Sequence, residues 1–109
     1  MNNDLKVYLA QINSSVGDIA GNLNKILQQI QLAEEKKCDL IIFPELTISG
    51  YPCLDLWKKK SFVEDCEQAI ISIIEFSKNL KTAILVGSVI SDTFKNKKII
   101  RNSALLIEE

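Results

Sequence analysis

The sequence predicts an α/β layered domain with the element order β-α-β-α-β-β. Two hydrophobic patterns alternate along the 109 residues: short runs that are apolar on both faces, and longer stretches with helical spacing. Strands that are buried on both faces need helices or a second sheet to cover them, which favours a layered α/β fold. The length favours a single domain over 1–109, and right-handed crossovers are expected for its β-α-β units.

The first half of the chain supplies a strand, a helix and a second strand. The short β-rich run 5–12 predicts the first strand. Apolar residues then recur at helical spacing, which predicts a helix over 22–37 with Asn22 as its N-cap. The continuous apolar run 40–43 predicts the second strand, and Pro44 ends it because proline cannot donate to a sheet ladder.

The second half begins with a long loop and ends in two strands. Residues 44–60 contain glycine, proline and a lysine run, and they indicate a loop with one helical turn. A second amphipathic pattern predicts a helix over 62–80, and an apolar run predicts a strand over 83–90. A polar turn near 94–98 leads to the last strand, 103–107.

Composition excludes several classes of function. The 47% hydrophobic content argues against a disordered tail, and the net charge of −1 argues against a nucleic-acid-binding protein. With no histidine, the chain by itself cannot build a Ser-His-Asp triad, a Cys-His dyad or a histidine-containing zinc site. Cys38, Cys53 and Cys66 form no C-x-x-C pair, so we expect no metal site and no redox motif.

The N-terminal residues and the cysteine count together predict the cellular compartment of the protein. The apolar run 7–10 is too short for a signal peptide or a membrane span, so we expect no membrane association. An odd number of cysteines without a signal peptide is typical of reduced thiols in a cytoplasmic protein.

Glu45 is the most informative position for chemistry. It follows a buried strand directly, and ligands of α/β sheets bind beyond the carboxyl ends of strands. Its apolar neighbours Phe43 and Leu46 are expected to desolvate the carboxylate in part, which would make it a better base. Position alone favours an ordinary exposed loop glutamate, and the surrounding string changes that balance.

That string, 40–52, reads LIIFPELTISGYP, and it resembles the nitrilase, or carbon–nitrogen hydrolase, superfamily around its catalytic glutamate. The opening LAQINSSVGD, followed by Gly21-Asn22 and a helix, is similar to the start of the same superfamily. Asn102-Ser103-Ala104 is similar to the strand that precedes the superfamily's catalytic lysine. The segments match in order along essentially the whole chain. The combination of Val16-Gly17-Asp18, Ser49-Gly50-Tyr51-Pro52 and Asp55-Leu56 looks closest to the glutaminase domains of glutamine-dependent NAD synthetases.

The resemblance implies a four-layer α-β-β-α sandwich and a glutamate–lysine–cysteine triad. The glutamate takes the thiol proton, the thiolate attacks an amide or nitrile carbon, and the lysine stabilises the developing charge. Only the glutamate is matched, by Glu45, because the lysine and the cysteine of the superfamily lie beyond the last strand. We therefore expect a truncated carbon–nitrogen hydrolase domain, inactive alone, that needs no cofactor and whose substrate when completed is a small amide such as glutamine.

Other residues near the motif have two interpretations each. By family analogy Tyr51 lines a substrate pocket, although packing under the loop is as good an interpretation. Cys53 could lie near the pocket mouth, but an ordinary loop thiol is favoured. The run Lys58-Lys59-Lys60 is typical of a solvated surface, and Trp57 of a packing anchor. Gly87, inside an apolar strand, indicates a close backbone approach or a bulge, and Asn102 a turn or edge position.

Three roles are compatible with this sequence. The first is one piece of a split or truncated amidase, with a complementing C-terminal fragment as partner. The second is a non-catalytic interaction module or homo-oligomer that pairs through an unfinished sheet. The third is a decayed remnant, poorly soluble because its apolar strands lack a covering layer.

Overall fold

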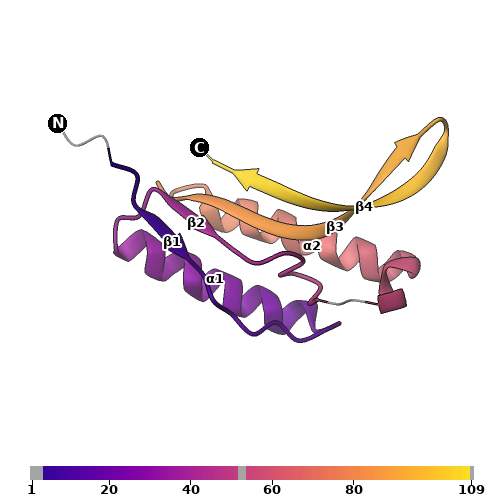
Figure 1. Cartoon of the computed structure of the whole chain (residues 1–109), viewed down its shortest axis with the longest axis horizontal. Coiled ribbons are helices and arrows are strands. Elements are labelled where there is room, and N and C mark those ends of the chain that lie inside the picture. Colours follow the sequence, from indigo (N-terminus) through magenta and orange to yellow (C-terminus); the bar gives the residue numbers. More distant parts are fainter. Residues whose placement is uncertain (1–3, 52–53, 109) are drawn as a thin grey trace.

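The computed structural model describes residues 4–51 and 54–108 and contains one four-stranded sheet with both of its helices on one face (Figure 1). Its elements follow the order β-α-β-α-β-β, with one additional 3-10 helix before the second α-helix. This arrangement confirms the α/β fold class and the order that the sequence predicts.

The first three elements are β1 (Val7–Leu9), α1 (Ile19–Glu35) and β2 (Leu40–Ile42). The helix begins three residues before the predicted start, so the prediction of Asn22 as its N-cap is wrong. Asp18 is the N-cap instead, and its Oδ1 accepts a hydrogen bond from the Gly21 backbone N–H at 3.0 Å. Both residue types cap helices well, and the sequence pattern alone favoured the wrong one.

The remaining elements are η1 (Leu54–Lys58, a 3-10 helix), α2 (Lys60–Ser77), β3 (Ala83–Phe94) and β4 (Lys97–Ile107). Both final strands are longer than predicted, because most residues of the predicted polar turn belong to the strands. The two strands form one continuous hairpin. Only Lys95 and Asn96 turn the chain, with φ of 50° and 63°. Two consecutive residues of positive φ are the geometry of a tight hairpin turn whose twist matches the strands.

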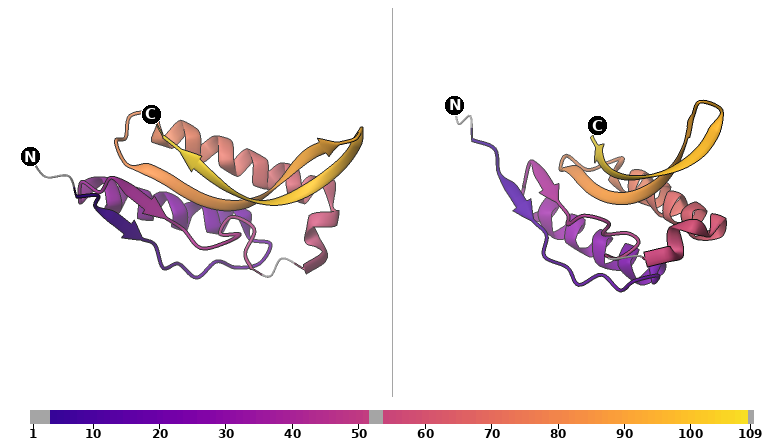
Figure 2. Two further views of the ribbon diagram at one scale, coloured as in Figure 1. Left: turned by 45° about the horizontal axis from the view of Figure 1, so that its top comes forward. Right: turned by 45° about the vertical axis from the view of Figure 1, so that its right-hand side comes forward.

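The sheet has the order β1-β2-β3-β4, with parallel pairing of β1 to β2 and of β2 to β3 and antiparallel pairing of β3 to β4. Viewed with its top turned forward, the sheet lies in front of the two helices (Figure 2). Ile41 and Ile84 at the sheet centre are fully buried, as are Ile26 and Ile30 of α1 and Ile73 of α2. The core therefore lies between the sheet and its helices.

Within residues 4–51 and 54–108, no helix lies on the opposite face of the sheet (Figure 1). Tyr8 donates a hydrogen bond to Gln29 of α1, so its neighbours on the strand, Val7 and Leu9, turn to the open face. Leu9 is 70% exposed there, and Leu106 on β4 is 58% exposed. One helix layer and one sheet layer of the expected four-layer sandwich are thus present, and the inner face of that sheet meets solvent. Among the described residues, no helix combines the length and apolar character needed to cross a bilayer.

Candidate active site

Glu45 lies in the loop that follows β2, on the open side of the sheet. The loop leaves the sheet immediately: the Phe43 N–H still donates to the Leu85 carbonyl at 2.9 Å, and then Pro44 ends the ladder. The Thr47 hydroxyl donates back to the Pro44 carbonyl, and the Gly50 N–H donates to the Leu46 carbonyl at 2.8 Å. These internal hydrogen bonds make the segment 44–50 a compact turn.

The backbone of this turn rests directly on β3 at Gly87. A Cβ atom at Gly87 would lie 2.6 Å from the Leu46 nitrogen and 3.2 Å from the Pro44 oxygen. The Ile48 N–H also donates to the Gly87 carbonyl at 3.4 Å. This confirms the close backbone approach predicted for Gly87, and it fixes the height of the Glu45 backbone above the sheet.

Asn22 ties the same turn to the N-terminal loop from inside the protein. Its fully buried side chain accepts a hydrogen bond from the Ser15 N–H at 2.8 Å and donates to the Ser15 carbonyl at 2.8 Å. It also donates to the Ile48 carbonyl at 2.9 Å. Asn22 therefore connects two loops across the N-terminal end of α1, a role its place in the sequence does not reveal.

The side chain of Glu45 meets Asn102 of β4. The amide nitrogen Nδ2 of Asn102 donates to Oε1 of Glu45 at 2.5 Å. The sequence predicts a turn or edge role for Asn102, and the structure places it on β4, the edge strand of the described sheet, opposite Val89 of β3. The contact spans 57 positions of the chain, so no local pattern could have shown it.

Glu45 and Asn102 line one hollow of about 370 Å³ on the open face of the sheet. The rest of its lining comes from the end of β2 and from the centres of β3 and β4. Its lining residues are Phe43, Pro44, Glu45, Leu85, Val86, Gly87, Asn102, Ser103 and Ala104. The hollow is walled on one side only, because none of the described elements covers the open face.

The expected desolvation of Glu45 by its neighbours is not observed. Phe43 and Leu46 are each 6% exposed because they turn into the core, whereas Glu45 is exposed. Leu46 has a φ of 51° in this turn. Phe43 lines the same hollow as Glu45, but the carboxylate side chain stays exposed. Any layer that screens this carboxylate from water has to come from outside the described residues.

The structure does not bring Tyr51 into this hollow. Its ring is 67% exposed and is not among the lining residues. Cys53 lies outside the described residues. Cys38 and Cys66 are buried, as their interpretation as small hydrophobic residues predicts.

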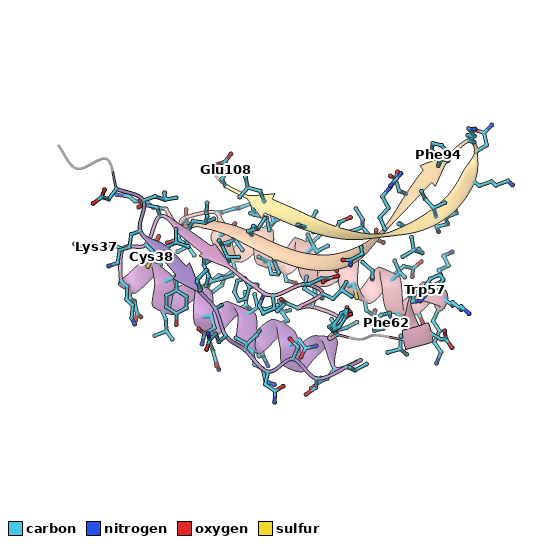
Figure 3. The ribbon with its side chains drawn as sticks, viewed as in Figure 1. Lys37, Cys38, Trp57, Phe62, Phe94 and Glu108 are labelled. Carbon is cyan, nitrogen blue, oxygen red and sulfur yellow. The ribbon has the colours of Figure 1, made fainter. Side chains whose placement is uncertain are left out.

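The run Lys58-Lys59-Lys60 is exposed, as predicted for a solvated surface. Trp57 is 42% exposed on η1 and borders a second hollow between α2 and the hairpin (Figure 3). It therefore packs less completely than a buried anchor would. Within the described part of the chain, no group of three or more His, Cys, Asp or Glu side chains is arranged to hold a metal ion.

Comparison with known proteins gives one family. Residues 6–109 match the family model described as carbon-nitrogen hydrolase. The chain is 38% identical over 88 residues to the glutamine-dependent NAD(+) synthetase of Thermotoga maritima, covering 81% of this chain and 15% of that protein. It is also 38% identical over 106 residues to the Synechocystis glutamine-dependent NAD(+) synthetase, covering 94% and 19%. The chain thus spans less than a fifth of the length of these relatives.

Solved structures show the same fold. The glutamine-dependent NAD+ synthetase of Acinetobacter baumannii superposes with a TM-score of 0.82 at 30% identity, over 95% of this chain and 19% of that one. An amidase from Nesterenkonia superposes with a TM-score of 0.74 over 95% of this chain and 38% of that one. At 20% identity, the amidase supports the fold alone.

Proposed function

The chain belongs to the carbon-nitrogen hydrolase family, and from that premise we propose that it is the N-terminal part of a glutamine-hydrolysing amidase domain. It resembles the N-terminal glutaminase part of the glutamine-dependent NAD synthetases. The observation that carries the proposal is the position of Glu45. Its carboxylate stands at the carboxyl end of a parallel strand, lines a hollow, and has one oxygen held by Asn102.

In the proposed reaction Glu45 is the general base. Its carboxylate takes the proton from a cysteine thiol, and the thiolate attacks the side-chain amide carbon of glutamine. The C–N bond then breaks, the proton returns from Glu45 to the departing nitrogen, and ammonia leaves. Water, deprotonated by the same carboxylate, then attacks the thioester carbon. The C–S bond breaks, the leaving thiolate takes the proton back from Glu45, and glutamate is released. A lysine ammonium would balance the charge of the tetrahedral intermediate.

The thiol and the ammonium of this reaction are proposed to come from the remainder of the family domain. Among the described cysteines, Cys38 and Cys66 are buried and neither lines the hollow beside Glu45. The hollow is also open on the side away from the sheet. We therefore propose that residues 1–109 form a partial domain that releases no ammonia from glutamine alone.

The proposed partner is a complementing C-terminal fragment, whose own sheet would cover the open face. The exposed apolar side chains Leu9 and Leu106 give that face its driving force for association. The covering layer would also exclude water from Glu45, which strengthens the electrostatic interactions on which the reaction depends.

A chimera tests the function. This chain would replace the matching N-terminal segment of the Thermotoga maritima relative, and ammonia release from glutamine would be measured. We expect activity in the chimera, none in the 109 residues alone, and a loss of about 100-fold or more in kcat for Glu45→Gln, because general base catalysis contributes about that much.

Two controls make the result decisive. The exposed Glu108 carries no proposed role, so Glu108→Gln should leave kcat unchanged. Full activity in the Glu45→Gln chimera would refute the general-base role. An inactive but assembled chimera would favour the alternative, a non-catalytic interaction module.

A further inference from the structure

We propose that Asn102 is a positioning residue for Glu45: its amide holds one carboxylate oxygen and thereby presents the other to the proton that is to be transferred. The inference rests on the general-base function proposed above. It is carried by the hydrogen bond from Asn102 Nδ2 to Glu45 Oε1, at 2.5 Å.

The two oxygens of Glu45 differ in their surroundings. Oε1 accepts the hydrogen bond from Asn102, whereas Oε2 has no hydrogen-bond partner within the described part of the chain. An ionised carboxylate can only accept hydrogen bonds, and an amide NH2 group can donate but cannot take up the proton. Asn102 therefore occupies one oxygen without competing for the transferred proton, and Oε2 stays available.

Asn102 is held more rigidly than Glu45. The contact therefore fixes the side chain of Glu45 and not that of Asn102. Asn102 stands in a continuous antiparallel ladder, between Ser103 paired with Ser88 and Arg101 paired with Ile90. Glu45 is an exposed side chain on a turn, and such a side chain loses considerable rotamer freedom when it is fixed. The strand thus holds the loop side chain in one orientation before a substrate binds, which is what catalytic positioning requires.

The competing interpretation is that the hydrogen bond between Asn102 and Glu45 only stabilises the loop. That loop is already fixed by other contacts: the Gly87 and Leu85 carbonyls accept its N–H groups, and Asn22 holds the Ile48 carbonyl. Loss of Asn102 should therefore release the Glu45 side chain while the loop backbone stays in place. The two interpretations make different predictions for kcat and for folding.

The first test needs no enzymatic activity. The sample is the isotope-labelled 109-residue chain with Leu9→Lys and Leu106→Lys, substitutions outside this hollow that put charges on the open face and oppose association. NMR would follow the side-chain amide protons of Asn102. We expect Glu45→Ala to move these resonances upfield, and Glu108→Ala, at an exposed position, to leave them unchanged. If the chemical shifts of these resonances did not change in Glu45→Ala, the contact would be absent in solution and the proposal would be overturned.

The second test measures kinetics in the active chimera described above. Asn102→Ala should lower kcat about 10- to 100-fold with little change in KM, because the lost hydrogen bond orients the base and does not touch the substrate. Asn102→Asp keeps the shape but replaces the donor with a second carboxylate, so we expect an equal or larger loss. Lys98→Ala, on the same strand but outside this hollow, is the matched control and should retain full kcat.

The outcomes separate the two proposals. An unchanged kcat in both Asn102 variants overturns the positioning role and leaves the function of Glu45 intact. A loss of thermal stability that accounts for the lost activity, shared by both variants, also overturns the positioning role. An unsubstituted chimera that assembles but releases no ammonia refutes the proposed function, and the positioning role falls with it.

Discussion

At the scale of single residues, the position of Glu45 depends on neighbours that carry no reactive group. Gly87 lets the loop backbone lie against β3, and Asn22 ties that loop to the segment before α1. Asn102 then meets the carboxylate itself. Each of these residues contacts the Glu45 loop from another strand or helix. The effect of substituting each one can be predicted and measured.

Gly87→Ala should destabilise the protein by about 1–3 kcal/mol, as overpacking of a filled site does. The added methyl would lie 2.6 Å from the Leu46 nitrogen, which is backbone and cannot move aside without shifting Glu45. Urea unfolding measures the change. Thr93→Ala, an exposed position on the same strand, is the control and should change stability by at most about 0.5 kcal/mol. Equal effects of the two substitutions would contradict the close approach at Gly87.

Asn22→Ala should cost about 2–3 kcal/mol, because it removes three hydrogen bonds of a fully buried side chain and leaves the buried Ile48 carbonyl without that partner. Asp18→Ala removes only the helix cap, at a cost of about 1 kcal/mol. Thermal unfolding of the two variants compares them directly. If Asp18→Ala proved the more damaging substitution, the structural role assigned to Asn22 would be wrong.

At the scale of elements, the β3–β4 hairpin extends past the region where β2 pairs with β3, and its tip carries Phe94 (Figure 3). This distal part is stabilised by cross-strand contacts. Asp92 and Arg101 form an ion pair between the two strands at 2.8 Å. Cross-strand pairs of opposite charge support a hairpin where little core is available.

The hairpin should weaken in acid. The Thr93 backbone N–H and then the Arg101 guanidinium hold the pKa of Asp92 below its usual 3.8. A lowered pKa in the folded state means that this stabilisation is present above about pH 3.8 and is lost as the pH falls through the folded value. The chemical shifts of the hairpin amides, followed by NMR between pH 6 and pH 2.5, should report this loss.

Asp92→Asn is the matched variant for this experiment, because it keeps the shape and removes the titrating group. Its hairpin should already be weakened at pH 6 and should change less on acidification. An identical pH dependence in both proteins would show that Asp92 does not stabilise the hairpin.

At the scale of the whole molecule, the structure is a layer of two helices and a sheet whose second face is open (Figures 1 and 2). The apolar side chains that would fill the centre of a sandwich, among them Leu9 and Leu106, meet solvent instead. Exposed apolar surface of this kind favours association. The same face carries the hollow with Glu45. The solubility of the chain and its proposed activity therefore depend on the same covering layer.

The 109-residue chain alone should therefore associate or aggregate. Leu9→Lys combined with Leu106→Lys should raise the monomer fraction, measured by size-exclusion chromatography with light scattering, because charges oppose burial of the open face. Leu32→Lys, at a 40% exposed position on α1, is the control and should leave association unchanged. A monomeric unsubstituted chain with a sharp cooperative melt would contradict the prediction.

The sequence determined the order of elements, the fold class and the place of Glu45 after the second strand. These features follow from hydrophobic periodicity and from Pro44. Both are patterns of a few neighbouring residues, so they can be recognised in the sequence alone. Gly87 was predictable for the same reason, since a glycine inside an apolar strand already indicates a close approach.

Tertiary structure alone decided which side chains meet. Asp18 rather than Asn22 caps α1, because Asn22 is drawn inward to bind two loops. The exposure of Glu45 and its hydrogen bond to Asn102 depend on a turn at Leu46 and on the register of β3 with β4. Such contacts join residues tens of positions apart, and local propensity contains no information about the distance between them once the chain has folded.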